Sequence, residues 1–377
     1  QLRYSASYSF NKKFSSRDQL TAGIVTDLNR LKLRNDYIPD GAQEMTTLFD
    51  TRNLSWLLRG YANLGHRFSD RFSTNLGIHG QWFTLNNTAS IEPRLNIRYQ
   101  LRPDQSLAFG AGLHSQLQPL EVYFYETTGS NGQQSLTNRD LGMVKSLHSV
   151  LGYDISFSKH IRLKAEVYGQ YIYHAAVEKT ASAFSLLNSG ADFYFPDKTN
   201  LVNQGDGYNY GAELTVERFL DEGLYFLVTG SVFQSKYRGS DKQWRNTAFN
   251  SNFACNFLVG KEFPINRKSS FGIDSKLAWA GGQRYTPFDY AATAAAGYVI
   301  FRDDLAYSLQ NEAYLRWDFK LSYSRNGKKT TQKWYVDLQN LTNRQNMYFR
   351  TLNPKTGKSG EIYQIGFFPN VNYMITF

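Results

Sequence analysis

Few residues of this chain have types and spacings that could support covalent chemistry. None of the six histidines lies near another at the spacing of metal ligands; they are His66, His79, His114, His148, His160 and His174. There is no Gly-x-Ser-x-Gly, no His-Glu-x-x-His and no phosphate-binding glycine loop. The one cysteine, Cys255, lies among alternating apolar residues and is interpreted as a small hydrophobic side chain. We therefore expect no catalysis, no metal site and no cofactor.

Charged residues occupy every second position of several segments, where they could bind an ion or a charged ligand. Between Ser90 and Arg102, Glu92, Arg94 and Arg98 alternate with apolar residues, and Arg316 lies in a second such segment. A guanidinium binds carboxylate or phosphate through paired hydrogen bonds, so the three arginines are candidate ligand contacts. The competing interpretation is structural: these charges pair with one another or with a domain packed against them.

Aromatic residues in or beside the long polar segments are a second set of candidates. Exposed aromatic rings among adaptable polar residues favour binding, which makes candidates of Tyr123, Tyr125, Tyr194, Trp244 and Tyr285. The competing interpretation is a ring of interfacial aromatics at a membrane surface. We favour that second interpretation for Tyr208, Tyr210, Trp279 and Trp317.

The elements that must position these residues are β-strands. From Tyr363 to Phe377 every second residue is apolar or aromatic, and most of the residues between them are polar or small. The same alternation runs from Ser90 to Arg102, from His160 to His174 and from Ala313 to Ser324. A period of two places the two sets on opposite faces of a strand, which a helix with its period of 3.6 cannot do.

Composition indicates where such strands would lie. Of 377 residues only 41% are apolar, yet 16% are aromatic, with 26 Tyr and 27 Phe. The mean hydropathy is −0.49, and no segment approaches the roughly 20 apolar residues of a membrane helix. Low hydropathy with many aromatics predicts an all-β antiparallel transmembrane barrel, in which only alternate residues touch lipid. A soluble β-sandwich is the alternative, but it would need turn signals every 8–12 residues or so.

The net charge of +10 favours anionic neighbours such as lipid head groups. Lys and Arg are spread among strands and turns without forming one stripe, so we expect no nucleic-acid partner.

The expected connections alternate between short and long, as they do in outer-membrane barrels. Short turns fall at 11–17, 69–70, 102–105, 158–159, 221–223, 264–268 and 325–328, and long loops near 33–50, 119–140, 177–206, 238–246, 284–310 and 351–360. Asn86-Asn87 is a short link where a long one is due. Seven hairpins and a C-terminal strand make about 15 strands in one unit, 1–377. Because bacterial barrels have an even number, we expect the C-terminal part of a larger barrel, unless the count is wrong by one near Gln1 to Phe10.

Four segments resemble a known family. Trp334-Tyr-Val-Asp-Leu-Gln-Asn-Leu-Thr-Asn343 and Gly366-Phe-Phe-Pro-Asn-Val-Asn-Tyr-Met-Ile-Thr-Phe377 resemble the last two strands of TonB-dependent outer-membrane receptors. Gly211-Ala-Glu-Leu-Thr-Val-Glu217 and Gly281-Gly-Gln-Arg-Tyr-Thr-Pro287 are similar to segments of Bacteroidota-type members. The likeness covers most of the chain from about Tyr208 onward.

The resemblance implies a 22-stranded barrel filled by an N-terminal plug. Neither a plug nor a TonB box is recognisable in these residues. The implied function is to bind a scarce nutrient at extracellular loops and import it past the plug when TonB pulls. The ligand is left open among a metal chelate, a glycan, a peptide and a vitamin.

The resemblance also implies a location, the outer membrane of a Gram-negative bacterium, and a set of partners. These are outer-membrane lipid and lipopolysaccharide, TonB through a missing N-terminal segment, and the barrel-assembly machinery, which would read Tyr373, Ile375 and Phe377. A surface lipoprotein is a further candidate partner. The alternatives are a plugless porin or surface scaffold, a barrel enzyme of the phospholipase or protease type, and a soluble binding module.

Overall fold

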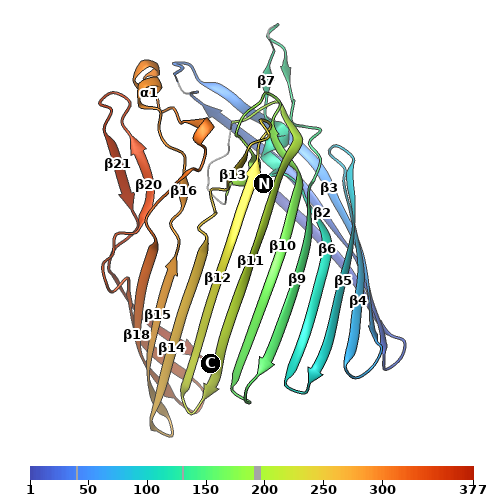
Figure 1. The fold of residues 1–377 in the computed structure, drawn as a ribbon, viewed down its shortest axis with the longest axis vertical. Coiled ribbons are helices and arrows are strands. Elements are labelled where there is room, and N and C mark those ends of the chain that lie inside the picture. The colour runs from blue at the N-terminus through green and yellow to red at the C-terminus, as the bar shows by residue number, and fades with distance from the viewer. Residues whose placement is uncertain (40, 130, 191–196) are drawn as a thin grey trace.

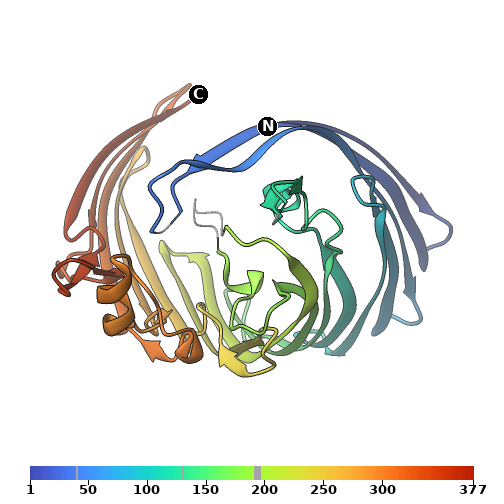
Figure 2. The same cartoon turned by 90° about the horizontal axis from the view of Figure 1, so that it is seen from above.

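One curved antiparallel sheet makes up most of the molecule. The structure, a computed structural model, describes residues 1–39, 41–129, 131–190 and 197–377. Within them, fifteen long strands pair in chain order, and a sixteenth short strand, β13, pairs with β12 at the side of this path. The sheet curls around a lumen, and its two outermost strands, β1 and β22, approach each other without being paired in the described part of the chain (Figures 1 and 2).

The strands of the wall follow each other as hairpins. Their bounds are β1 Leu2–Lys13, β2 Asp18–Tyr37, β3 Thr46–Arg67, β4 Phe72–Phe83, β5 Thr88–Arg102, β6 Gln105–Gln116, β9 Val144–Ser156, β10 Ile161–Glu178, β11 Leu201–Asp221, β12 Leu224–Arg238, β14 Phe253–Asn266, β15 Ser269–Ala280, β18 Tyr314–Asn326, β19 Thr331–Gln339 and β22 Phe368–Thr376. The expected all-β fold and the count of about 15 strands are confirmed.

The loops at one end carry the remaining elements. They are η1 Leu120–Phe124, β7 Thr127–Thr128, β8 Gln134–Ser135, η2 Leu186–Asn188, β13 Trp244–Asn246, β16 Arg284–Tyr285, α1 Tyr290–Ala296, η3 Asp303–Leu305, β17 Leu309–Gln310, β20 Met347–Leu352 and β21 Ser359–Tyr363. None of the helices formed by the described residues has the length and apolarity needed to cross a bilayer.

Loop length separates the two ends of the wall as the sequence predicts. All seven expected short turns join consecutive strands, and β4 and β5 are linked by the expected short connection at Asn86-Asn87. The short turns lie together at the lower end in Figure 1, and the long loops at the upper end. We call these the short-turn end and the long-loop end.

Several loop boundaries differ from the expectation: β11 already begins at Leu201, inside the loop expected at 177–206, and the loop expected at 238–246 continues to the start of β14 at Phe253. The loop expected at 33–50 is shorter, because β2 and β3 continue to pair as far as Tyr37 and Thr46. Leu31 and Phe49 of this extended hairpin are buried in an apolar cluster with loop residues, and this packing stabilises the extra strand length.

The expectation of one strand from Tyr363 to Phe377 is also wrong. β21 ends at Tyr363 and pairs with β20, whereas β22 begins at Phe368 and pairs with β19. The backbone N–H groups between them bond to the loop: that of Gln364 donates to the Asn346 carbonyl at 2.8 Å, and that of Phe367 to Asn343 Oδ1 at 2.9 Å. The last loop is therefore longer than the expected segment 351–360 and contains a hairpin of its own.

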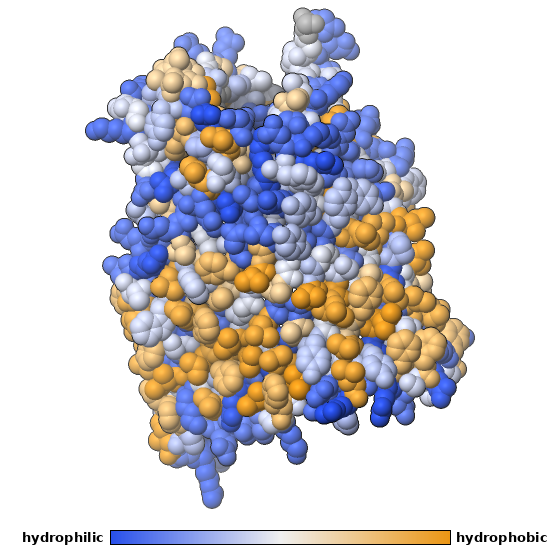
Figure 3. Space-filling view, in the orientation of Figure 1, coloured by the Kyte–Doolittle hydropathy of each residue, from blue (hydrophilic) through white to orange (hydrophobic). Residues whose placement is uncertain are grey.

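The alternation along the strands separates an apolar outer face from a polar lumen face. On β5, Ile91 is 69% exposed on the outside, whereas its neighbour Glu92 is 1% exposed in the lumen wall. Figure 3 shows the outer face, with an apolar band over the half of the wall nearer the short turns and a polar surface beyond it. A wall that is apolar outside and polar inside is what a barrel in a bilayer requires.

This arrangement predicts that the two faces of one strand respond differently to substitution. Leu214 lies on the outer face of β11, and the residue before it, Glu213, lies on the other face. In the full-length protein reconstituted in phospholipid vesicles, we expect Leu214→Arg to lower the free energy of unfolding by about 2–4 kcal/mol, since a guanidinium would enter hydrocarbon. Glu213→Gln is the control and should change it by less than about 0.5 kcal/mol. Urea titration checks both, and equal effects would contradict the assignment of the faces.

Candidate functional site

A pocket of about 600 Å³ opens among the loops at the long-loop end. Its lining comes from segments far apart in sequence: β16 with the helical segment that follows it, the β20–β21 hairpin, the loop between β12 and β14, and Asn188 of η2. Much of this lining is aromatic: Phe249, Tyr285, Phe288, Phe301, Tyr348 and Phe349. Arg284, Arg350 and one carboxylate, Asp303, add charge to this lining, which can therefore hold a ligand that has both apolar and anionic parts.

Tyr285 is the expected binding residue that lies in this pocket. The Arg350 guanidinium lies 4.9 Å from the centre of its ring, a cation–π contact between β16 and β20. Arg350 is held there by Glu361, at 2.6 Å, and by Asn311 Oδ1, at 3.1 Å. The pair joins two loops into one wall of the pocket.

Arg284 supplies the second positive charge. Its Nε donates to the Asn250 carbonyl at 2.8 Å and its Nη2 to Asn252 Oδ1 at 3.0 Å. Both partners are neutral oxygens, and burial lowers the pKa of the guanidinium from its ordinary value. An arginine has five N–H donors and stays charged in proteins, so Arg284 keeps donors and a charge for a ligand in the pocket that it lines.

Two glycines fix the position of Arg284. A Cβ on Gly281 would lie 1.7 Å from the Ser251 carbonyl oxygen, and one on Gly282 would lie 1.9 Å from that of Asn311. The Gly-Gly pair that opens the segment Gly281–Pro287 therefore lets its backbone approach the backbone of Ser251 and Asn311 closely. A side chain at either position would force these segments apart.

Tyr123 and Tyr125 do not lie at a surface. Both are fully buried at the long-loop end, in the cluster that η1 forms with β2 and β3. The Gln118 N–H donates to the Tyr123 hydroxyl at 3.2 Å, and the Tyr125 ring stacks on Phe49 with centroids 5.9 Å apart. The expectation that the two rings are exposed is wrong. Burial of their apolar surface stabilises the folded loop. Their role as ligand contacts stays an untested prediction.

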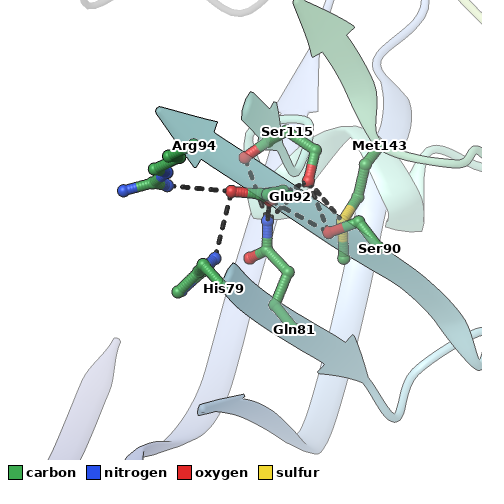
Figure 4. Close-up of polar contacts among 7 residues, drawn as sticks. All are labelled: His79, Gln81, Ser90, Glu92, Arg94, Ser115 and Met143. Carbon is green, nitrogen blue, oxygen red and sulfur yellow. Dashed lines mark hydrogen bonds and ion pairs between the residues drawn. The ribbon is translucent and has the colours of Figure 1, made fainter. Parts of the chain in front are cut away.

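Arg94 belongs to a polar cluster in the lumen wall (Figure 4). Its Nη2 contacts Glu92 Oε2 at 3.0 Å, and the buried Glu92 also accepts hydrogen bonds from Gln81, Ser90 and Ser115 and contacts His79 at 3.0 Å. Side chains from the neighbouring strands β4, β5 and β6 thus together provide the hydrogen-bond and ion-pair partners of the buried Glu92 carboxylate.

The other candidate arginines of the lumen also have partners in the wall. Arg98 Nη2 donates to Ser106 Oγ at 3.3 Å, and Arg316 Nε donates to Asp318 Oδ1 at 2.7 Å. Further lumen pairs are Arg3–Asp27, Arg162–Glu217, Lys164–Glu166 and Lys320–Asp274. This pairing fits the structural interpretation of these charges, and a ligand role for the three arginines stays untested.

The remaining candidates lie apart from the pocket. Trp244 is exposed on the outer face, where its ring contacts Tyr208 and Arg238. Tyr194 falls outside the described residues. The expected assembly signal lies on the edge strand β22 and just after it: Tyr373 packs on Trp334 with centroids 5.3 Å apart, Ile375 is exposed, and Phe377 is 92% exposed.

Sequence reasoning missed Arg284 and Arg350. Arg284 lies inside the quoted Gly281–Pro287 segment, so its position directly before Tyr285 was a usable signal. Arg350 directly precedes the loop expected near 351–360, and no spacing in the sequence indicates that β20 would lie against Tyr285.

Comparisons with known proteins agree with this architecture. A sequence model of the family described as "TonB dependent receptor-like, beta-barrel" matches residues 2–341. No curated protein matches the chain. Among solved structures, a mutant of the ferric enterobactin receptor PfeA from Pseudomonas aeruginosa superposes with a TM-score of 0.65 at 14% identity, covering 99% of this chain and 53% of that one.

Two further solved structures match equally well. The ferric yersiniabactin uptake receptor FyuA from Yersinia pestis gives a TM-score of 0.66 at 14% identity, covering 100% of this chain and 54% of that one. BauA, the ferric preacinetobactin receptor from Acinetobacter baumannii, gives 0.63 at 13% identity, with 99% and 54% covered. The chain thus spans about half the length of these receptors, and at such identities the likeness shows the fold.

The glycine pair leads to a test of the pocket. In the full-length protein, we expect Gly281→Ala to displace β16 from Ser251, because the new methyl group would overlap a carbonyl oxygen. Hydrogen exchange at the β16–β17 pair should then accelerate, which mass spectrometry of the peptides around Arg284 detects. Gly60→Ala is the control: its added Cβ would lie 3.9 Å from the Gly23 carbonyl oxygen, an ordinary contact, and the variant should leave this exchange unchanged. Unchanged exchange in Gly281→Ala would contradict the close approach.

The burial of Tyr123 leads to a pH prediction. Burial raises the pKa of Tyr123 to about 12, against about 10 in an unfolded chain. The neutral hydroxyl therefore stabilises the folded loop fully below pH ~10, and that contribution is lost as the pH rises through the folded pKa. The phenolate absorbance of the wild type minus that of Tyr123→Phe should titrate near 12. A midpoint near 10 would show an exposed ring.

Proposed function

The chain belongs to the TonB-dependent receptor-like β-barrel family, and from this premise we propose that it forms part of the barrel of an outer-membrane nutrient receptor. The receptor captures a scarce nutrient at its extracellular long-loop end and admits it past a plug that TonB displaces. Binding and gating suffice for this function, and we propose no catalytic role.

The pocket between β16 and the β20–β21 hairpin carries the proposal. It opens at the end of the wall that in this family faces outward, and it combines aromatic rings with Arg284 and Arg350. Most lumen charges have partners within the wall, whereas Arg284 is bonded to neutral oxygens. The unneutralised charge therefore lies where a ligand would arrive first.

We further propose that this chain is the C-terminal part of a 22-stranded barrel. β1 and β22 present ladder groups that are unpaired within the described residues, and such groups are not tolerated against lipid. Additional strands would pair with both edges, and a plug would fill the lumen. Residues 1–377 would then form one barrel unit, and TonB would act through a segment N-terminal to them.

The remaining partners follow from the same proposal. The location is the outer membrane of a Gram-negative bacterium, with lipopolysaccharide around the barrel, and the barrel-assembly machinery would read Tyr373, Ile375 and Phe377. The likeness of Gly281–Pro287 supports a Bacteroidota-type receptor, for which a surface lipoprotein is a candidate partner. A plugless porin is the less favoured alternative, since the matched solved structures are receptors and transporters.

Uptake by cells tests the function. A strain whose own receptor gene is deleted should lose uptake of one labelled nutrient from a panel of ferric chelates, glycans, peptides and vitamins. The native full-length receptor should restore this uptake only when TonB is present. Uptake of that nutrient without TonB would support the passive barrel instead.

Arg284 gives the sharper test of the pocket. We expect Arg284→Ala to weaken binding of the nutrient about 10- to 100-fold, the usual effect of losing a hydrogen bond to a charged group. Arg302→Ala is the matched control, since Arg302 lies in the same loop but pairs with Asp304 at 2.7 Å on the surface. Equal effects on the dissociation constant would contradict the pocket while leaving TonB-dependent import standing.

A further inference from the structure

A group of aromatic rings from β10, β11 and β13 lies on the outer face at the edge of the apolar band. Tyr208 and Tyr210 are stacked, with centroids 6.1 Å apart and 14° between their planes, and Trp244 lies 4.8 Å from Tyr208. Tyr171 is the register partner of Tyr208 on the next strand. All but Tyr208 are exposed and Tyr208 is half-buried. We call these four residues the aromatic platform.

Positive charges border the platform. The Arg238 guanidinium lies 5.0 Å from the centre of the Trp244 ring, and Lys236 is the register partner of Tyr208 on β12. Asp206 holds Arg238 at 2.7 Å and accepts a hydrogen bond from the Tyr171 hydroxyl at 3.2 Å. Asp206 balances the charge of Arg238, and Lys236 forms no ion pair among the described residues, so the border of the platform is positively charged overall.

The platform lies where the wall changes from polar to apolar. On β11, even-numbered residues on the outer face run toward the short turns in the order Asp206, Tyr208, Tyr210, Ala212 and Leu214. On β12, the same change occurs between Lys236 and Val232, the register partner of Ala212. Aromatic rings at such a boundary lie at the depth of the lipid head groups.

An apolar groove of about 570 Å³ continues from the platform toward the short turns. Small residues form its floor, since Ala212 and Gly230 lie on adjacent strands. Val167, Leu214 and Val232 form its sides. A groove of this composition has the shape and chemistry to take an acyl chain, and burial of apolar surface favours its occupation.

We propose that the platform and the groove together bind one phosphorylated glycolipid of the outer leaflet. A sugar ring presents C–H groups of partial positive charge, which suit the negative faces of Tyr208, Tyr210 and Trp244. The phosphate of the same lipid would lie against Lys236 and Arg238, and one acyl chain would lie in the groove. This inference rests on the proposed outer-membrane location but not on the proposed import, because the site is separate from the nutrient pocket.

The arrangement goes beyond an ordinary aromatic girdle. A girdle needs only rings at the interface, as exemplified by Trp82, which is exposed near the long-loop end of β4 with Leu58 and Ala89 as its register partners. In the platform, by contrast, Tyr208 and Tyr210 stack in parallel, the Trp244 ring is tilted against Tyr208, and Asp206 fixes both Tyr171 and Arg238. A phospholipid would supply a phosphate and an acyl chain but no sugar ring for these faces.

Native mass spectrometry of the full-length protein tests the proposal. The protein is exchanged into nanodiscs of phosphatidylethanolamine containing lipid A, a phosphorylated diglucosamine lipid, and the lipid A retained after extraction into detergent is counted. We expect Trp244→Ala and Lys236→Gln each to reduce retention about tenfold, as the loss of a stacking or charge contact would. Trp244→Phe should retain more than Trp244→Ala, because it keeps a ring. Trp82→Ala should retain lipid A as the wild type does.

The same experiment includes one control for folding of the variants and one for binding of a phospholipid in place of lipid A. Strand content by circular dichroism confirms that each variant is folded before its lipid is counted. Phosphatidylglycerol, which carries a phosphate without an aminosugar, should displace lipid A poorly from the wild type. Equal loss in Trp82→Ala, or equal displacement by phosphatidylglycerol, would overturn the proposal and reduce the platform to an interfacial girdle.

Discussion

The structure depends on one constraint: backbone N–H and C=O groups that face hydrocarbon must be paired within the protein. Consecutive hairpins meet this constraint, because each of the long wall strands between β1 and β22 pairs with a neighbour on both sides. Pairing fixes the orientation of each strand, so the period-two alternation of side chains gives an apolar outer face, whose band is visible in Figure 3, and a polar lumen wall. The same constraint makes β1 and β22 the places where the proposed additional strands must pair.

Charged side chains have different partners in the lumen wall and at the long-loop end. In the lumen wall most charges lie beside opposite charges on the same or neighbouring strands, as Glu92 does with Arg94 and Arg162 does with Glu217. At the long-loop end, buried tyrosines such as Tyr123 stabilise the loops, while Arg284 donates its hydrogen bonds to the neutral oxygens of Asn250 and Asn252. The proposed capture of a ligand at the loops, above a lumen wall whose charges are mostly paired, suits the proposed receptor, whose ligand would pass through the lumen.

Sequence reasoning predicted the features that rest on local periodicity and failed where distant segments meet. The strands, their number and all seven short turns follow from alternation and turn residues. The break between Tyr363 and Phe368 was missed, because it depends on Asn343 and Asn346 satisfying backbone N–H groups from another part of the loop. The exposure of Tyr123 was wrongly predicted, since a ring in a loop has the same sequence signal whether it points outward or into an apolar cluster. The contact of Arg350 with Tyr285 has no local signal at all.

The central claim is that one face of this wall meets lipid and the other meets a wet lumen. Its most direct test is a spin-label scan along β11 of the full-length protein in phospholipid vesicles, with Cys255 replaced by Ser. Single cysteines at Ala212, Leu214 and Val216 are compared with cysteines at Glu213, Thr215 and Glu217. The account predicts that collisions with oxygen dominate at the first three positions and collisions with a water-soluble nickel chelate at the other three, with a period of two. Equal access of the nickel chelate to both sets would contradict it.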